Sequence, residues 1–127
     1  MKNHPMVEVK FRHVHPSPMS LNKLPLVGNG DCVTLVRTTI DSLKNLPTWK
    51  WEPGPRVLEA NDLVPGTAIA TFLCGKYPQD GITGKHAAIF IRYMGPQNPD
   101  GTYNSFMILD QWKTKARIGT RILSKKG

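Results

Sequence analysis

The sequence predicts an α+β fold in which one helix in the N-terminal half packs on an antiparallel sheet. Two observations carry this prediction: a stretch beginning near residue 31 has its apolar residues at helical spacing, and several short β-rich segments, separated by turn signals, follow it. The 127 residues, of which 39% are hydrophobic and 20% charged, fit one domain with one core. We expect a single domain over 1–127 with its core at about 28–123.

The predicted helix covers residues 31–45, directly after the turn Gly28-Asn29-Gly30. Asp31 suits the N-terminus of a helix, and Pro47 ends the helical pattern. The residues expected on the buried face recur at steps of three and four: Val33, Val36, Ile40, Leu43 and Leu46. Cys32 therefore falls in the first turn of this helix.

The rest of the chain divides into irregular segments and strands. Residues 1–27, broken by prolines, are expected to be an irregular lead-in with at most one strand, around 7–11. Residues 47–66, rich in Trp, Pro and Gly, are expected to form a long ordered loop, and 74–85 a second loop. Strands are expected at 67–73, 86–93 and 105–111, with a shorter one near 117–123.

The composition restricts the classes of partner. The formal charge of +8 attracts polyanions, which include nucleic acid, anionic membrane surfaces and bacterial wall polymers. The basic residues are scattered, apart from a C-terminal group that is usually a solvated face: Lys113, Lys115, Arg117, Arg121, Lys125 and Lys126. No apolar run is long enough to cross a membrane, and the N-terminus lacks the apolar segment of a secretory signal. We expect no membrane span and no cleavable signal.

Cys32 has the surroundings of a reactive thiol. The positive end of a helix and a nearby imidazole both lower the pKa of a thiol, and the free N–H groups of a first helical turn can bind an oxyanion. The turn Gly28-Asn29-Gly30 would let a substrate carbonyl approach closely, and we expect Gly30, Asp31 and Trp112 to contact the oxyanion or the substrate. A lone cysteine on an apolar helix is nevertheless more often a packing residue. Cys74 ends a strand without such surroundings, and we interpret it as a structural or incidental thiol, although a disulfide with Cys32 is open.

A base and its orienting group are predicted on one hairpin. His86 opens one strand and Asp110 lies near the end of the next, equidistant from a turn centred at residue 98. Residues in that relation face each other in an antiparallel hairpin, with Cβ atoms roughly 5 Å apart. Asp110 could then hold the imidazole of His86, which completes the logic of a nucleophile, a base and an orienting group.

The other histidines are not expected to bind metal. His13 and His15 could face the same way on a strand, and His4 lies nearby in the sequence, but no Cys, Asp or Glu cluster accompanies them. We interpret them as surface histidines and expect no metal site.

Four segments carry a resemblance to known enzymes: GNGDCVTLVR, PGTAIATF, GKHAAIFI and LDQW, within residues 28–112. In that order they resemble the NlpC-type and CHAP-type amidases of the papain-like superfamily. They look most like the small amidase effectors that type VI secretion systems deliver into rival bacteria. The resemblance implies a papain-like fold with Cys32 as nucleophile and His86 as general base. It places Asp110 where relatives keep a polar third residue.

The resemblance also implies a reaction and partners. The reaction is hydrolysis of an amide bond in peptidoglycan stem peptides or their crosslinks, through a thioester and without a cofactor. A monomer is expected, made in the bacterial cytoplasm, exported without a signal peptide and active in the periplasm of the target cell. A cognate immunity protein would plug its active site. Aromatic residues are candidates for the walls of the cleft: Trp49, Trp51, Tyr77 and Trp112.

Two other function classes remain open at this point. The fold could have lost catalysis and serve as a binding module for wall peptide or a protein, in which case Cys32 would not react rapidly with an alkylating agent. A nucleic-acid-binding protein is permitted by the charge. It is disfavoured because no aromatic and basic strand motif of the known RNA-binding modules appears.

Overall fold

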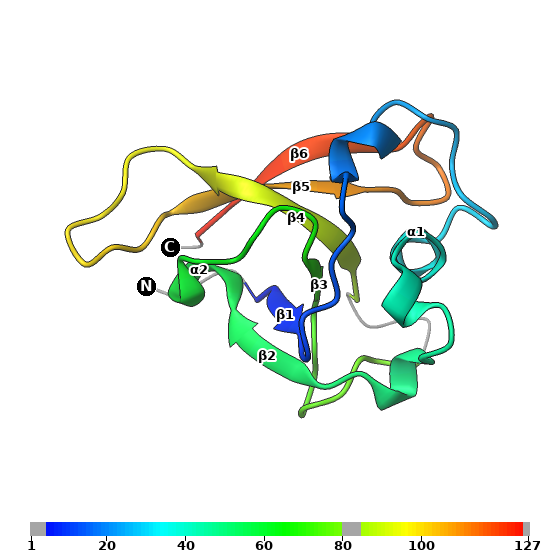
Figure 1. Ribbon diagram of the computed structural model, residues 1–127, viewed down its shortest axis with the longest axis horizontal. Helices are drawn as coiled ribbons and strands as arrows, with labels where there is room; N and C mark the ends of the chain where they lie inside the picture. Colours follow the sequence, from blue (N-terminus) through cyan, green and yellow to red (C-terminus); the bar gives the residue numbers. More distant parts are fainter. Residues whose placement is uncertain (1–4, 80–84, 126–127) are drawn as a thin grey trace.

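The computed structural model describes residues 5–79 and 85–125 and shows one main helix against a six-stranded sheet (Figure 1). The strands lie in the order β2-β1-β3-β4-β5-β6, and every neighbouring pair is antiparallel. The strands are β1 (Val7–Val9), β2 (Pro53–Arg56), β3 (Ala68–Ala70), β4 (Ala87–Met94), β5 (Ser105–Asp110) and β6 (Gly119–Ser124). The α+β prediction is confirmed.

The main helix, α1 (Cys32–Thr39), is shorter than predicted. It ends because Ile40 adopts an extended backbone with φ −103° and ψ 110°, and a 3-10 turn at Asp41–Leu43 follows. The hydroxyl of Thr39 donates to the carbonyl of Leu35 at 2.7 Å, the kind of local bond by which β-branched threonine competes with helix continuation. Further 3-10 turns lie at Pro18–Leu21 and Thr48–Lys50.

The sheet is buried on both faces along β4, which explains the nearly continuous apolar run in that strand. Alternate residues of β4 enter two separate core clusters. The cluster on the side of α1 includes Leu35, Val36, Ala87, Ile89 and Leu109. The other, on the side of the short helix α2 (Val57–Ala60), includes Val57, Leu58, Phe90, Phe106 and Ile108.

Two segments that the sequence presents as irregular belong to the fold. In the lead-in, β1 lies between β2 and β3, and the neighbouring Met6 is buried, so the core begins before residue 28. The predicted loop over 47–66 contains β2 and α2. Pro53 and Pro55 are compatible with an edge strand such as β2, because only one side of an edge strand must form hydrogen bonds with a neighbour.

The other strands agree with their predicted positions but differ in length. β3 has three residues instead of the seven expected over 67–73, while β4, β5 and β6 begin and end within a few residues of the predicted bounds. Part of the predicted loop over 74–85 lies outside the described residues. No helix among the described residues is long and apolar enough to span a bilayer.

Candidate active site

Cys32 is the first residue of α1, and the turn before it is built by side-chain hydrogen bonds. The side-chain amide oxygen of Asn29, Oδ1, accepts from the Asp31 backbone N–H at 3.0 Å and from the Thr34 hydroxyl at 2.7 Å. Asp31 is the N-cap residue, as predicted, but its carboxylate makes no capping bond; it lies 3.6 Å from the Lys113 ammonium. This turn fixes the direction in which the helix starts, and with it the position of the thiol.

Gln111 joins this turn to the end of β5. Its amide accepts from the Val27 N–H at 2.7 Å and donates to the carbonyls of Val27, at 3.0 Å, and Asp31, at 2.8 Å. The side chain is fully buried. Gln111 was not predicted as a site residue; its position next to Asp110 was the only signal in the sequence.

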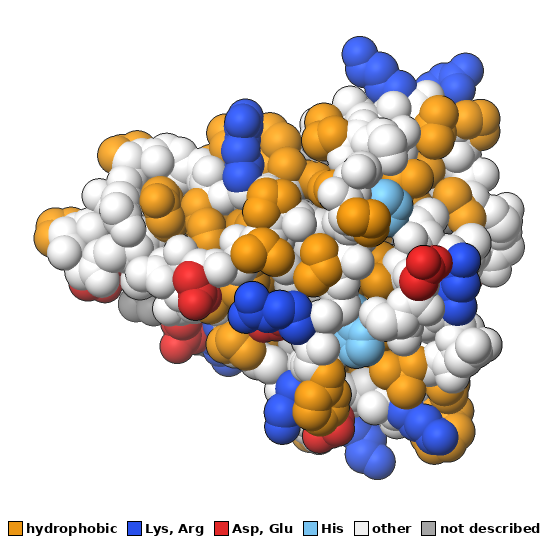
Figure 2. All heavy atoms as spheres, in the orientation of Figure 1, with side chains coloured by type: hydrophobic (Ala, Val, Ile, Leu, Met, Phe, Trp, Pro, Cys, Tyr) orange, Lys and Arg blue, Asp and Glu red, His pale blue; other side chains and the backbone are white. Residues whose placement is uncertain are grey.

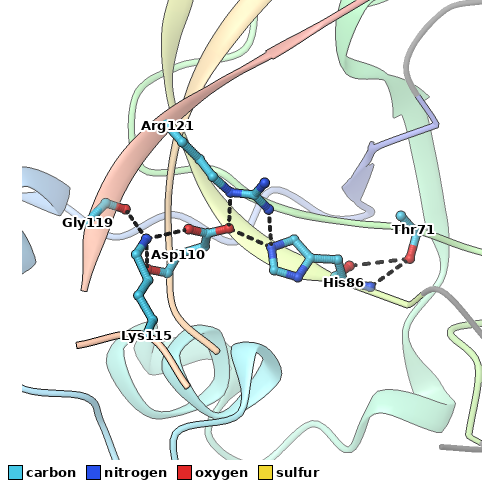
Figure 3. A network of polar contacts seen from close by, with 6 residues as sticks. All are labelled: Thr71, His86, Asp110, Lys115, Gly119 and Arg121. Carbon is cyan, nitrogen blue, oxygen red and sulfur yellow. Dashed lines mark hydrogen bonds and ion pairs between the residues drawn. The ribbon is translucent and has the colours of Figure 1, made fainter. Parts of the chain in front are cut away.

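His86 is fixed through its backbone just before β4. Its N–H donates to the Thr71 hydroxyl at 2.9 Å (Figure 3), and its carbonyl accepts from the Thr71 N–H at 2.9 Å. Because Thr71 follows β3, these bonds extend the β3–β4 pairing by one residue. The imidazole is consequently held at the end of the sheet.

Asp110 and His86 are in contact, as predicted, although the register differs. The distance from His86 Nε2 to Asp110 Oδ2 is 2.6 Å. The pairing Ile89↔Leu109, continued by one residue, places Ala88 opposite Asp110. The hairpin pairs Met94 with Ser105, so its centre lies beyond residue 98, and His86 is a diagonal neighbour of Asp110 rather than its direct partner. A bulge between Phe90 and Arg92 shifts the pairing by one residue, which keeps His86 on the same face of the sheet as Asp110.

Asp110 also binds two basic side chains that the sequence analysis assigned to a solvated group. Arg121 donates from Nε to Asp110 Oδ2 at 2.8 Å, and Lys115 Nζ lies 3.1 Å from Oδ1 (Figure 3). The carboxylate itself is fully buried. The interpretation of these two residues as solvated was wrong, because a buried carboxylate needs compensating positive charge.

The electrostatics of the three predicted residues favour an ion pair between cysteine and histidine. Burial raises the pKa of the Cys32 thiol, but the His86 imidazole, the Ala87 backbone N–H and the Tyr77 hydroxyl lower it by more, to below its usual value. Burial lowers the pKa of His86, but the hydrogen bond to Asp110 and the interaction with Cys32 raise it to about 9. Burial likewise raises the pKa of Asp110, and its three cationic partners bring it below the usual range.

A cavity of about 440 Å³ opens over the thiol and the imidazole. Its walls contain two of the predicted aromatic residues, Tyr77 and Trp112, whereas Trp49 and Trp51 do not line it. Trp51 is buried against Tyr77, and Trp49 is exposed. The remaining lining residues are Asp31, Cys32, Val33, Lys85, His86 and Lys113.

Gly30, predicted to lie beside the substrate, is buried and is not part of the cavity wall. Its φ of +86° and the backbone of Lys113 explain why glycine is needed, since a Cβ would lie 3.3 Å from Lys113 Cα. The glycine thus allows close packing of the turn and does not form a surface for substrate.

Cys74, His13 and His15 do not line this cavity. Cys74 is exposed, and both cysteines are free thiols. His13 was predicted to lie on the surface, but it is buried and bonded through Nδ1 to the Ser42 hydroxyl at 2.7 Å. His15 is half-buried and accepts from the Ser17 N–H, and His4 lies outside the described residues.

Comparison with known proteins gives one family and one curated relative. Residues 7–127 match the protein family described as Domesticated amidase effector 2. A curated relative from Salmonella typhi, named type VI secretion amidase effector 2 protein, is 32% identical over 117 residues, which cover 89% of this chain and 79% of the relative. No solved structure matches.

Proposed function

The chain belongs to the Domesticated amidase effector 2 family, and from that premise we propose that it is a cysteine amidase of papain-like fold that cuts bacterial peptidoglycan. The substrate bond is an amide in the stem peptides or their crosslinks. The observation that carries the proposal is the hydrogen bond between His86 Nε2 and Asp110 Oδ2. Because Nε2 of the ring is bonded to Asp110, Nδ1 is the nitrogen that can exchange a proton with the thiol of Cys32, which lines the same cavity.

In the proposed reaction, the Cys32 thiolate attacks the carbonyl carbon of the amide. Backbone N–H groups of the first turn of α1 stabilise the oxyanion that forms. The imidazolium of His86 gives its proton to the leaving amine as the C–N bond breaks, which leaves a thioester on Cys32. The neutral imidazole then takes a proton from water, whose oxygen attacks the thioester and releases the carboxylic acid and the thiolate.

The walls of the cavity suit an acidic peptide. Lys85 and Lys113 stand at the cavity with two aromatic rings, Tyr77 and Trp112. The ammonium of Lys85 lies 5.9 Å from the centre of the Tyr77 ring. Stem peptides of peptidoglycan carry free carboxylates, which two ammonium groups at the rim would attract.

The biological setting follows the relative from Salmonella typhi, whose name describes a type VI secretion amidase effector. We propose delivery into a competing bacterium, action in its periplasm, and a cognate immunity protein that blocks the cavity in the producing cell. A binding module without catalysis is the alternative, and the chemistry of the thiol separates the two.

The test is mass spectrometry of peptidoglycan fragments after digestion with the wild type, Cys32→Ala and Cys74→Ala. We expect defined stem-peptide products from the wild type and from Cys74→Ala, with a loss of at least about 1,000-fold in Cys32→Ala, because removing a nucleophile removes the covalent route. The product masses name the bond. Equal activity of Cys32→Ala and wild type would exclude Cys32 as nucleophile.

A further inference from the structure

Arg121 contacts both members of the Asp110–His86 pair. Its Nε donates to Asp110 Oδ2 at 2.8 Å, and its Nη2 lies 3.2 Å from His86 Nε2 (Figure 3). A guanidinium can only donate, and an Nε2 that gives its proton to Asp110 has no lone pair to accept. The contact between Arg121 and the ring is therefore not a hydrogen bond while that proton is in place. The effect of this contact is that the permanent positive charge of Arg121 lies beside the imidazole of His86.

One oxygen of Asp110, Oδ2, accepts hydrogen bonds from both His86 and Arg121. Oδ2 accepts from His86 at 2.6 Å and from Arg121 at 2.8 Å, while Oδ1 is 3.1 Å from Lys115. One carboxylate and two permanent cations give a fixed charge of +1 beside His86, where an isolated aspartate would give −1. An arrangement of this kind stabilises the imidazolium less than aspartate alone would.

The position of Arg121 is determined by the sheet and by Trp112. On β6, Gly119 pairs with Asp110, so Arg121 lies two residues further along the same face and reaches the carboxylate diagonally. The guanidinium carbon is 5.2 Å from the centre of the Trp112 ring, and the Lys115 ammonium is 4.6 Å from it. The side chain of Arg121 is 40% exposed, so solvent screens part of its effect.

We propose that Arg121 is a positioning residue that holds the Asp110 carboxylate and limits the basicity of His86, so that the imidazole can release and regain a proton in one catalytic cycle. The inference rests on the proposed function, in which His86 first protonates an amine and then takes a proton from water. An imidazolium held too strongly by a lone carboxylate would perform the first step and obstruct the second.

Other charged and titratable groups face His86 from the elements around it. Cys32 comes from α1, Tyr77 from the segment after β3, and Asp110 from β5, with Lys115 behind the carboxylate. Asp31, Lys85 and Lys113 line the same cavity. Replacing Arg121 removes none of these groups, and a comparison of Arg121→Gln with Arg121→Lys separates the loss of the positive charge from a displacement of Asp110.

The experiment is an NMR titration of the His86 imidazole in full-length protein labelled with nitrogen-15, with the resonance assigned by His86→Gln. In Arg121→Gln, removal of the cation should raise the titration midpoint of His86 by roughly 0.5–1 pH unit. Arg121→Lys keeps the charge and should restore most of the wild-type midpoint. Of the two carboxylate oxygens of Asp110, the Lys115 ammonium contacts only the one that is not bonded to His86, so Lys115→Gln should give a smaller rise. The alkaline limb of kcat/KM should move upward with the midpoint.

Two results would overturn the inference. One is a midpoint in Arg121→Gln that is unchanged or lower, which would mean that Arg121 only anchors Asp110; the other is an Arg121→Lys midpoint equal to that of Arg121→Gln. Arg121→Val, with a residue that is enriched in strands, repeats the test if glutamine disturbs β6. Failure of the proposed function gives a different signature: Cys32→Ala would leave the digestion of peptidoglycan unchanged, and Cys32→Ser would not change the titration midpoint of His86.

Discussion

Asp110 is the residue at which the charges of the site meet. Fully buried, it is bonded to one imidazole and two permanent cations. Burial would raise the pKa of its carboxyl, but these partners lower it, so it stays ionised across the neutral range. An ionised Asp110 raises the pKa of His86 to about 9 together with Cys32. The protonation state of the base therefore depends on the charge of Asp110.

The pH profile of Asp110→Asn tests this dependence. In the wild type, kcat/KM should fall on the alkaline side near pH 9, as His86 loses the proton that the leaving amine requires. Asparagine keeps the shape but removes the charge that raises the pKa of His86, so the alkaline limb should move to lower pH by about one unit. Rates on soluble peptidoglycan fragments between pH 5 and 10 measure it. If the alkaline limb of kcat/KM stays at the wild-type pH, the charge of Asp110 does not control the pKa of His86.

At the scale of elements, the site depends on the contact between the start of α1 and the end of β5. Gln111 makes three hydrogen bonds across that contact, to Val27 and Asp31, and it is buried. Gln111 therefore connects the turn before Cys32 to the end of β5, and so it helps to fix the position of the nucleophile relative to Asp110.

Gln111→Glu is the sharpest test of that connection, because it preserves shape and replaces two donated hydrogen bonds by repulsion between the new carboxylate and two carbonyls. We expect a loss of about 2–3 kcal/mol of stability and a lower kcat. Thermal unfolding followed by circular dichroism measures the first. Gln97→Glu, at an exposed amide bonded to the Gly101 carbonyl, is the matched control and should change stability by less than about 0.5 kcal/mol. Equal losses in the two variants would contradict the role given to Gln111.

The elements also show what the sequence could reveal. The apolar period predicted α1 and the β4–β5 hairpin, because long segments with clear periodicity depend on local pattern. It did not predict β2, whose Pro53 and Pro55 suggest a loop and are tolerated only at a sheet edge. The end of α1 at Thr39 was also missed, since the apolar spacing continues through the 3-10 turn to Leu43.

At the scale of the whole molecule, the net charge of +8 describes the chain as basic, but it does not show which basic residues belong to the site. Figure 2 shows Lys and Arg side chains spread around the visible face rather than gathered in one patch. Arg121 and Lys115 differ from these, because tertiary pairing brings them to a buried carboxylate. No local pattern distinguishes them from Lys113 or Arg117, so their part in the site became visible only from the fold.

The whole-molecule view also explains how separate motifs form one site. Cys32 is the first residue of α1, His86 directly precedes β4, and Asp110 is the last residue of β5; one cavity joins the thiol and the imidazole. The sequence placed Cys32 in the first helical turn and Asp110 near the end of its strand, and it placed His86 within one residue of the start of β4. Their catalytic roles remain the central claim of the account.

The most direct measurement of that claim compares the two cysteines in one sample. Wild-type protein is treated with iodoacetamide at pH 6.5, and mass spectrometry of its peptides gives the alkylation rates of Cys32 and Cys74. We expect half-buried Cys32 to react at least about 10-fold faster than exposed Cys74, because the His86 imidazole lowers the pKa of the Cys32 thiol, and we expect His86→Gln to remove the difference. If Cys74 reacts as fast as Cys32 or faster, Cys32 is not an activated nucleophile and the account is contradicted.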